Sequence, residues 1–257
     1  MSSLRIPDLA GKVFLVTGAS TGIGAAVALA LGEQGASVAV HYNASKASAE
    51  KVVAGIEKAG AKAFLVGGDV TTAKGPVEIV EKAAKHFGRL DGLINNAGSL
   101  VSRKPVGDGD DVFDHAVFDL NAHSVVRASR AALPWLRKQG GVVINTTSIS
   151  ARNGGGGGAV LYAASKGFVS TITRGLAKEW VGDRIRVNAV APGLIDTLFH
   201  ERGTPAAMYK AQESSIPMGR AGTPEECVGT YLFLASDALS GYITGQVIEV
   251  NGGQLMP

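Results

Sequence analysis

Short apolar runs alternate with longer amphipathic segments along nearly the whole chain. The runs are continuously apolar, which is typical of strands that are covered on both faces. They predict strands at Lys12–Thr17, Ser37–His41, Lys62–Val66, Leu90–Asn95, Gly141–Thr147, Ile185–Ala191 and Val247–Val250. The segments between them predict helices near Gly22–Gln34, Lys46–Ala59, Ala73–Phe87, Asp110–Gln139 and Leu161–Trp180. This alternation favours right-handed parallel crossovers, so we expect an α/β fold with a doubly wound parallel sheet and helices on both faces.

A single domain is predicted for residues 1–257. No linker or long internal repeat interrupts the pattern. The low-complexity stretch Gly154–Gly158 is too short for a domain linker and is interpreted as a loop. The expected architecture is therefore one Rossmann-like domain.

Composition and charge fit a globular protein. Hydrophobic residues make up 46% of the chain and charged residues 18%, which suits a domain with a sizeable core. The net charge is +3, but lysines and arginines are scattered from Arg5 to Arg220 without a dense basic block, which argues against nucleic acid as a partner.

The cellular compartment of the chain is predicted from its cysteine content and its apolar runs. The single Cys227 cannot form an intrachain disulfide, which is compatible with a reducing compartment. The first residues lack an apolar signal core, and no run of about 18 apolar residues could span a membrane. We therefore expect a cytoplasmic protein without a membrane partner.

A glycine-rich turn, Thr17–Gly24 (TGASTGIG), follows the first predicted strand and opens the first predicted helix. Glycines there let the backbone approach a phosphate, and the helix N-terminus offers N–H groups and a positive dipole end. Ligands of doubly wound sheets bind at the carboxyl ends of strands. The turn therefore predicts a dinucleotide site, although its spacing departs from G-x-G-x-x-G and a purely structural turn is the other interpretation.

A hydrolase is a sharper alternative for the same residues. Gly18–Gly22 also matches G-x-S-x-G, in which Ser20 would be a nucleophile followed downstream by an acid and then a histidine. The histidines lie in no recognisable triad context, which disfavours this alternative; they are His41, His86, His115, His123 and His200.

Tyr162 and Lys166 are four residues apart in a predicted helix, so their side chains are expected on one face. A phenol with its ordinary pKa is a poor base at neutral pH, and a nearby cation favours the phenolate and lowers that pKa. Ser148, at the carboxyl end of the fifth predicted strand, could hydrogen-bond the same substrate oxygen. Taken alone, a Tyr-x-x-x-Lys pair is usually an exposed helix face.

The motifs occur together and in order, and the chain resembles the classical short-chain dehydrogenase/reductase family. The resemblance covers Lys12 to about Gly253. It rests on Thr17–Gly24, Asp69, Asn95-Asn96-Ala97-Gly98, Asn121, Ser148, Tyr162-x-x-x-Lys166 and Pro192-Gly193.

The resemblance implies a catalytic set. Tyr162 would be the general acid/base, and Lys166 would lower its pKa and hydrogen-bond the nicotinamide ribose. Ser148 would polarise the substrate oxygen, and Asn121 would hold a water that extends a proton relay to Lys166. The implied activity is hydride transfer between a nicotinamide cofactor and a secondary alcohol or carbonyl. An ordinary helix residue is the alternative interpretation of Asn121.

The resemblance also implies a cofactor site. Asp69 would hydrogen-bond the adenine beside Val70, although Asp69 could instead cap the helix near Ala73. Asn95 could be purely structural. The other implied cofactor residues are Gly18, Ser20, Thr21, Gly22, Ile23, Gly24, Asn96, Ala97, Gly98, Tyr162, Lys166, Pro192, Gly193, Ile195 and Thr197.

NADP is favoured over NAD by the end of the second strand. An acid there would bind the ribose hydroxyls and repel a 2′-phosphate, but the chain has His41 and no acid through Lys46. Ser45 and Lys46 could receive that phosphate at the start of the next helix. Thr21, where many NADP-preferring relatives carry Arg, argues for NAD, and Lys46 could equally be a solvated helix residue.

The substrate is left open by two further departures from the family pattern. The segment Gly154–Gly158 replaces a mixed, partly apolar loop, and Asn251 stands where Asp is commoner. Specificity is expected from about Gly154–Leu161 and Leu194–Gly219. A sugar or polyol dehydrogenase and a 3-oxoacyl-thioester reductase are both compatible, and a non-catalytic cofactor-sensing protein is the alternative from another class.

A homotetramer is also expected. The helices near Leu120–Gln139 and Leu161–Trp180 are richer in Ala, Val and Leu than one sheet-facing stripe needs. The resemblance implies a four-helix interface from these helices, although both could simply be buried within the monomer.

Overall fold

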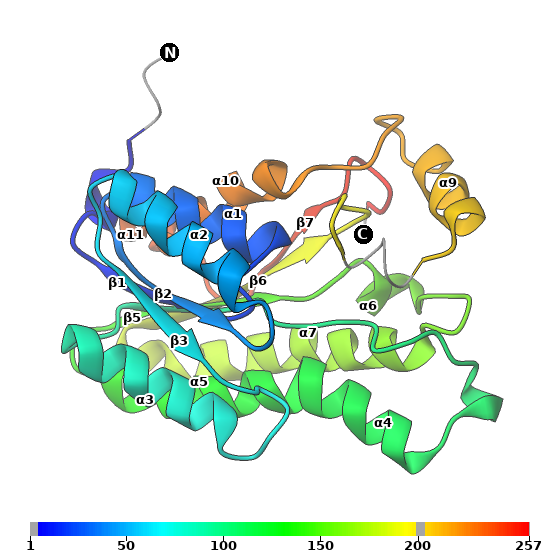
Figure 1. The fold of residues 1–257 in the computed structure, drawn as a ribbon, viewed down its shortest axis with the longest axis horizontal. Coiled ribbons are helices and arrows are strands. Elements are labelled where there is room, and N and C mark those ends of the chain that lie inside the picture. Colours follow the sequence, from blue (N-terminus) through cyan, green and yellow to red (C-terminus); the bar gives the residue numbers. More distant parts are fainter. Residues whose placement is uncertain (1–4, 199–203, 257) are drawn as a thin grey trace.

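The computed structural model describes residues 5–198 and 204–256, which leaves His200 and part of Leu194–Gly219 outside the described residues. Within the described residues, parallel strands form a seven-stranded sheet in the order β3-β2-β1-β4-β5-β6-β7 (Figure 1). The strands are β1 Val13–Val16, β2 Ser37–Tyr42, β3 Ala63–Gly67, β4 Gly92–Asn95, β5 Gly141–Thr146, β6 Ile185–Pro192 and β7 Val247–Val250.

Helices cover both faces of the sheet. They are α1 Gly22–Glu33, α2 Lys46–Lys58, α3 Gly75–Phe87, α4 Asp111–Phe118, α5 Ser124–Leu136, α6 Ser150–Asn153, α7 Val160–Trp180, α9 Ala206–Ser214, α10 Pro224–Ala235 and α11 Asp237–Ser240. Short 3-10 turns lie at Pro7–Leu9, Val106–Asp108 and Val181–Asp183, and a π-helical turn joins α4 to α5 at Asp119–His123. None of the helices in these described ranges is long and apolar enough to cross a membrane.

Two apolar layers hold the sheet between the helices. On one face, Phe14, Leu31 and Tyr231 belong to the core formed with α1, α2 and α10. On the other face, Leu15 and Trp180 belong to the core formed with α3, α5 and α7. Figure 1 shows these two groups of helices on opposite sides of the sheet. The continuous apolar strands are explained by this double cover, since successive side chains point to opposite faces.

The strand order places the ligand crevice. The chain runs outward from β1 to β2 and β3, then crosses back so that β4 pairs with the other side of β1, with Leu15 opposite Leu93. The carboxyl ends of β1 and β4 therefore flank the point where the strand order reverses, which is where open α/β sheets bind ligands. The predicted doubly wound fold is confirmed, and most predicted elements agree with the structure to within one or two residues.

The main differences lie between and after the predicted elements. The segment Asp110–Gln139 is broken by the π-helical turn, and α9 and α10 follow the sixth strand where no helix was predicted. α10 packs directly against α1, so it completes the cover of the first apolar layer.

Candidate active site and cofactor groove

The glycine turn after β1 is held by the segment that follows β4. Gly18 has φ +63°, and a Cβ there would lie 2.9 Å from Cα of Ala97. Thr17 Oγ1 accepts hydrogen bonds from the backbone N–H groups of Asn96 (3.0 Å) and Ala97 (3.1 Å). Asn96 Nδ2 in turn donates to the carbonyl oxygens of Thr17 (3.1 Å) and Gly18 (3.0 Å). The two motifs predicted from the sequence therefore form one interlocked unit, and Thr17 is the member whose role was not foreseen.

The α1 N-terminus that opens from this turn is suited to a phosphate. The Thr21 side chain, at the N-cap, makes no capping hydrogen bond to the first helical turn. A Cβ at Gly22 (φ +57°) would lie 3.2 Å from Cγ2 of Thr197. The turn is therefore in contact with the segment after β6, and the α1 N-terminus, with its free N–H groups and positive dipole end, begins at this contact.

Both ring nitrogens of His41 bond the protein itself, so its predicted place among the cofactor-binding side chains is wrong. Its side chain is buried, with 1% of its surface exposed. Its Nδ1 accepts from the backbone N–H of Gly18 (3.0 Å), which leaves Nε2 to donate to the carbonyl of Gly68 (3.0 Å). Burial lowers the pKa of His41, so the ring is neutral and has no lone pair or N–H left for a ribose. His41 is a structural tie between the glycine turn and the loop after β3.

The other residues predicted near the adenosine end are more accessible. Ser45 and Lys46 are exposed at the start of α2, where Lys46 pairs with Glu50 at 3.6 Å. Asp69 does not cap α3, because its Oδ1 accepts from the N–H (2.9 Å) and hydroxyl (2.8 Å) of Thr71 in a local turn. Val70 directs its side chain into the core, so only its main chain could face an adenine.

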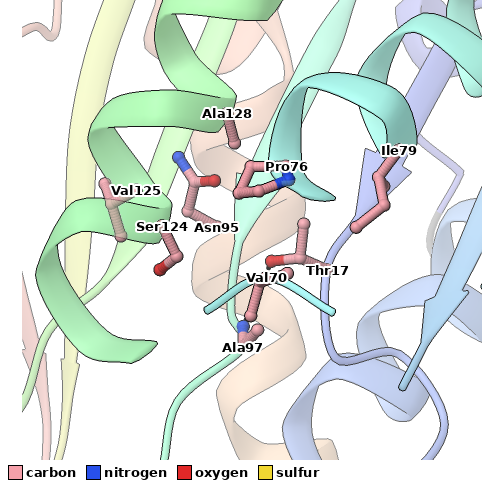
Figure 2. Close-up of a pocket in the computed structure, with 9 residues that line it drawn as sticks. All are labelled: Thr17, Val70, Pro76, Ile79, Asn95, Ala97, Ser124, Val125 and Ala128. Atoms are coloured by element: carbon pink, nitrogen blue, oxygen red, sulfur yellow. Dashed lines mark hydrogen bonds between the residues drawn. The ribbon is translucent and has the colours of Figure 1, made fainter. Parts of the chain in front are cut away.

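Val70 belongs to a small cavity beside the glycine turn. Figure 2 shows its lining, which comes from β4, α3 and α5 and from the segments that follow β1, β3 and β4. The cavity measures about 10 Å³, which is far too small for a cofactor or a substrate, so it is a packing gap. Its polar lining is satisfied, since Asn95 Nδ2 donates to Ser129 Oγ (3.1 Å) and Asn145 Oδ1 (2.9 Å). These buried contacts support the structural interpretation of Asn95.

The turn after β6, which the resemblance assigns to the nicotinamide, packs against the segment after β7. A Cβ at Gly193 would lie 2.7 Å from Cβ of Asn251. Asn251 Nδ2 donates to the carbonyl of Leu255 (2.9 Å), and its Oδ1 accepts from the N–H of Gly253 (3.0 Å). An ionised aspartate could not make the first of these bonds, which explains the departure from the family pattern.

Ser148, Tyr162 and Lys166 meet at the carboxyl end of β5. The Ser148 hydroxyl hydrogen-bonds Tyr162, which lies in the first turn of α7. Lys166 lies one turn further on, with Nζ 5.8 Å from the centre of the Tyr162 ring and donating to the carbonyl of Thr146 (2.8 Å). The predicted cluster is therefore assembled, and Thr146 is a further member that anchors the lysine.

Burial dominates the electrostatics of this cluster. Burial raises the pKa of Tyr162 to about 12, against a smaller lowering by its hydrogen bond to Ser148. Burial lowers the pKa of Lys166 to about 8. Burial of both groups therefore opposes the expected depression of the phenol pKa by Lys166, whose ammonium donates to the carbonyl of Thr146, and that depression stays a prediction.

Asn121 reaches the cluster from the π-helical turn. Its side chain is fully buried, and a Cβ at Gly98 would lie 2.8 Å from Asn121 Oδ1 and 3.1 Å from Lys166 Nζ. Its amide accepts from the N–H of Ser99 (3.0 Å) and donates to the carbonyls of Ser99 (2.8 Å) and Val117 (2.9 Å). The side chain is thus committed to the backbone, and its predicted relay water stays a prediction. Across the described residues, no His, Cys, Asp and Glu gather as a metal site would require.

Known proteins share both the sequence pattern and the fold. The family model described as Enoyl-(Acyl carrier protein) reductase matches residues 18–254. General stress protein 39 of Bacillus subtilis (strain 168) is 40% identical over 248 residues, covering 96% of this chain and 86% of its own. The 3-oxoacyl-(acyl-carrier-protein) reductase FabG of Thermotoga maritima is 40% identical over 250 residues, covering 95% of this chain and 98% of its own.

Solved structures agree closely. The NADH-dependent reductase A1-R', responsible for alginate metabolism, has a TM-score of 0.91 at 40% identity, covering 98% of this chain and 100% of its own, and its complex with NAD is also known. A short chain dehydrogenase from Burkholderia cenocepacia J2315 in complex with NADP has a TM-score of 0.90 at 34% identity, covering 96% of this chain and 99% of its own. The chain belongs to the classical short-chain dehydrogenase/reductase family of nicotinamide-dependent oxidoreductases.

Proposed function

We propose that this chain reduces a ketone or aldehyde group with Tyr162 as the general acid. The observation that carries the proposal is the Ser148–Tyr162 hydrogen bond at the carboxyl end of β5. Because burial raises the pKa of the phenol to about 12, Tyr162 holds its proton at neutral pH and is ready to donate it to a carbonyl oxygen. Ser148 would hydrogen-bond and polarise that oxygen, and Lys166, fixed by Thr146, would hold the nicotinamide ribose. Oxidation of the corresponding alcohol is the same chemistry reversed.

A nicotinamide cofactor fits the glycine turn. Gly18 and Gly22 have positive φ and carry no side chains, and the Thr21 side chain does not cap α1, so the first N–H groups of this helix are available to a pyrophosphate. When bound in reduced form, the cofactor supplies the hydride. The chain's own part is to hold its phosphates with the turn and its ribose with Lys166.

NADP is the cofactor that we favour. Ser45 and Lys46 are exposed at the start of α2, and no acid lies between His41 and Lys46 to repel a 2′-phosphate. Because the His41 ring is buried, the argument for NADP rests on the residues from Tyr42 to Lys46. The relatives include proteins with either cofactor, so they do not choose between the two.

A compact, hydroxylated carbonyl compound is the substrate class that we favour. The loop 154–158 offers main-chain groups and no apolar side chains toward the substrate end of the site. A sugar-like or polyol substrate suits such a surface, and a 3-oxoacyl thioester is the alternative, since a relative bears that activity. A non-catalytic cofactor sensor is disfavoured because a sensor has no need of Ser148, Tyr162 and Lys166 in contact.

A homotetramer in the cytoplasm completes the proposal. Val160 and Phe168 on α7 are 46% and 37% exposed, although their helix also lines the core. Such apolar side chains would be covered when α5 and α7 meet their copies in a symmetric assembly. Light scattering should give four times the mass of one chain, and a monomer that persists with bound cofactor would contradict this assembly.

The activity is tested by a substrate panel. Purified protein is mixed with NADH or NADPH and with hydroxylated ketones, aldehydes and a 3-oxoacyl thioester, and the loss of absorbance of the reduced nicotinamide is followed. We expect consumption with at least one hydroxylated carbonyl, faster with NADPH. Turnover confined to the thioester would overturn the substrate class, and a preference for NADH of tenfold or more would overturn the cofactor.

A further inference from the structure

Three segments lie next to the catalytic cluster or next to one another. Residues 99–105 follow β4 and Gly98, which faces Lys166. Residues 154–159 connect α6 to α7, between Ser148 and Tyr162. Thr204 and α9 come after β6, and Figure 1 shows α6 and α9 near the same end of the molecule. Contacts among these segments therefore shape the substrate side of the site.

Arg103 joins all three segments. Its Nη1 donates to the carbonyl oxygens of Gly156 (3.1 Å) and Gly157 (3.2 Å). Its Nη2 donates to Oγ1 of Thr204 (3.2 Å). The next residue adds a backbone bond, because the N–H of Lys104 donates to the carbonyl of Gly158 (2.9 Å). A guanidinium spreads five N–H donors over three nitrogens in a rigid plane, whereas an ammonium has three donors on one atom, so the guanidinium is better suited to acceptors from separate segments.

Residues 99–105, which follow β4, are bent so that Arg103 turns back toward the loop 154–158. Val101 has φ +64°, a left-handed conformation that is rare for a β-branched residue. Its N–H donates to Oγ of Ser99 (3.1 Å), and the N–H of Ser102 donates to the carbonyl of Leu100 (2.8 Å). Strain of this kind persists only where the surroundings fix the backbone, and it gathers near functional sites.

The glycine loop has a defined shape that fits this arginine. Gly158 has φ +80°, and a Cβ there would lie 2.8 Å from the backbone N of Lys104. A Cβ at Gly157 would lie 2.6 Å from Cε of Met208 on α9. Gly156 differs, because nothing lies within 4 Å of its Cβ position and its φ is ordinary. The close approach of the three segments therefore depends on particular glycines of the run.

We infer that Arg103 is a positioning residue that fixes the substrate-binding surface by clamping loop 154–158 to residues 99–105 and to Thr204. The inference rests on the proposed function and adds a specificity-determining residue to it. Ser148, Tyr162 and Lys166 are held by β5 and α7 without Arg103, so the clamp governs how substrate is seated and not how the proton moves. Its loss should raise KM for the carbonyl substrate and leave kcat and cofactor binding nearly unchanged.

The kinetic test compares Arg103→Ala and Arg103→Lys with Arg137→Ala. Arg137 is a matched control, since it bonds Asp183 (2.7 Å) and the two residues precede β5 and β6 respectively, at the amino ends of these strands and away from Ser148. Arg103→Ala should raise KM by roughly tenfold, because a hydrogen bond to a charged group is worth about one order of magnitude in an equilibrium constant. Arg103→Lys should show a smaller rise, and the control none. An unchanged KM in Arg103→Ala, or a loss confined to kcat, would overturn the inference.

Two further experiments test the clamp without a measurement of turnover. Hydrogen exchange of the Lys104 amide and of residues 154–160 should speed up at least several-fold in Arg103→Ala, since these groups lose their restraint. Gly158→Ala should reproduce the faster exchange and the higher KM, and Gly156→Ala should match the wild type. If no carbonyl substrate is turned over but exchange still rises, the proposed function fails and the clamp stands. Unchanged exchange in Arg103→Ala sinks the clamp whatever the activity.

Discussion

Two glycine-rich segments in this chain have similar compositions and different physical roles. The turn Thr17–Gly24 is held by polar groups: Asn96 Nδ2 and His41 Nδ1 bond the backbone of Gly18, and Thr17 Oγ1 accepts from the backbone N–H of Asn96. The loop 154–158 is held from outside by one partly exposed arginine and one backbone bond. The first segment presents a fixed surface to a cofactor that does not vary. The second can be reshaped by changing one side chain, which is what a substrate-specific surface requires.

The largest difference between the two segments is expected when one glycine of each is replaced by alanine. A Cβ at Gly24 would collide with the carbonyl oxygen of Gly18 and with Asn96 Nδ2, so Gly24→Ala should displace the turn. We expect cofactor affinity to fall by at least about a hundredfold, because a 1 Å misplacement can have that effect on a site. Calorimetric titration with NADPH and NADH measures the loss.

Gly156→Ala is the matched control in the other segment, where a Cβ meets nothing. Cofactor affinity and KM should both stay at the wild-type level. Equal losses in the two variants would show that the segments are not distinguished by their packing, and the comparison would fail.

A smaller effect is expected from His41→Asp. A carboxylate at this buried position could still accept from Gly18 but could not donate to Gly68, and burial opposes its charge. We expect the free energy of unfolding to fall by roughly 1–3 kcal/mol, measured by urea titration. The ratio of catalytic efficiencies with NADPH and NADH should not reverse.

Ser45→Asp is the contrasting variant for cofactor choice. The residue is exposed at the start of α2, where an acid would repel a 2′-phosphate and would not weaken the helix start. Preference should move toward NADH with stability unchanged. Should His41→Asp switch the preference instead, the assignment of His41 as a structural tie would be wrong.

The fold was predictable because it depends on local patterns. Continuous apolar runs such as Val13–Val16 identify buried strands wherever they occur. α10 was missed although a signal was present: Thr223 and Glu226 form a capping box and Pro224 lies in the first turn. α10 has apolar residues on several sides and so lacks an amphipathic pattern, and no preceding motif marks it as the glycine turn marks α1.

The site was predictable as a set of motifs and unpredictable in its long-range contacts. Ser148, Tyr162 and Lys166 were identified from spacing and resemblance, and the structure brings them together. The role of His41 could not be deduced, because its partners Gly18 and Gly68 are distant in sequence. The contacts of Arg103 with loop 154–158 were not predicted for the same reason. The sign of the Tyr162 pKa shift depends on burial, which residue spacing does not reveal.

The smallest expected effect is a difference spectrum that reports the Tyr162 phenol. Subtracting the tyrosinate absorbance of Tyr162→Phe from that of the wild type, without cofactor, isolates this side chain. Because burial favours the neutral phenol and raises its pKa to about 12 from 10.0, no tyrosinate signal from Tyr162 should appear as the pH rises to 10. A midpoint below 10.0 would show that Lys166 lowers the pKa in the protein alone, as the spacing had suggested.

The central claim is that Tyr162 transfers the proton in a nicotinamide-dependent reduction. The measurement that tests it most directly is the turnover of Tyr162→Phe on the best substrate of the panel, together with its cofactor affinity. The variant lacks only the hydroxyl, so kcat should fall by about 10²–10⁴-fold while the dissociation constant of the cofactor stays nearly the same. Turnover at the wild-type rate in the purified variant would contradict the account.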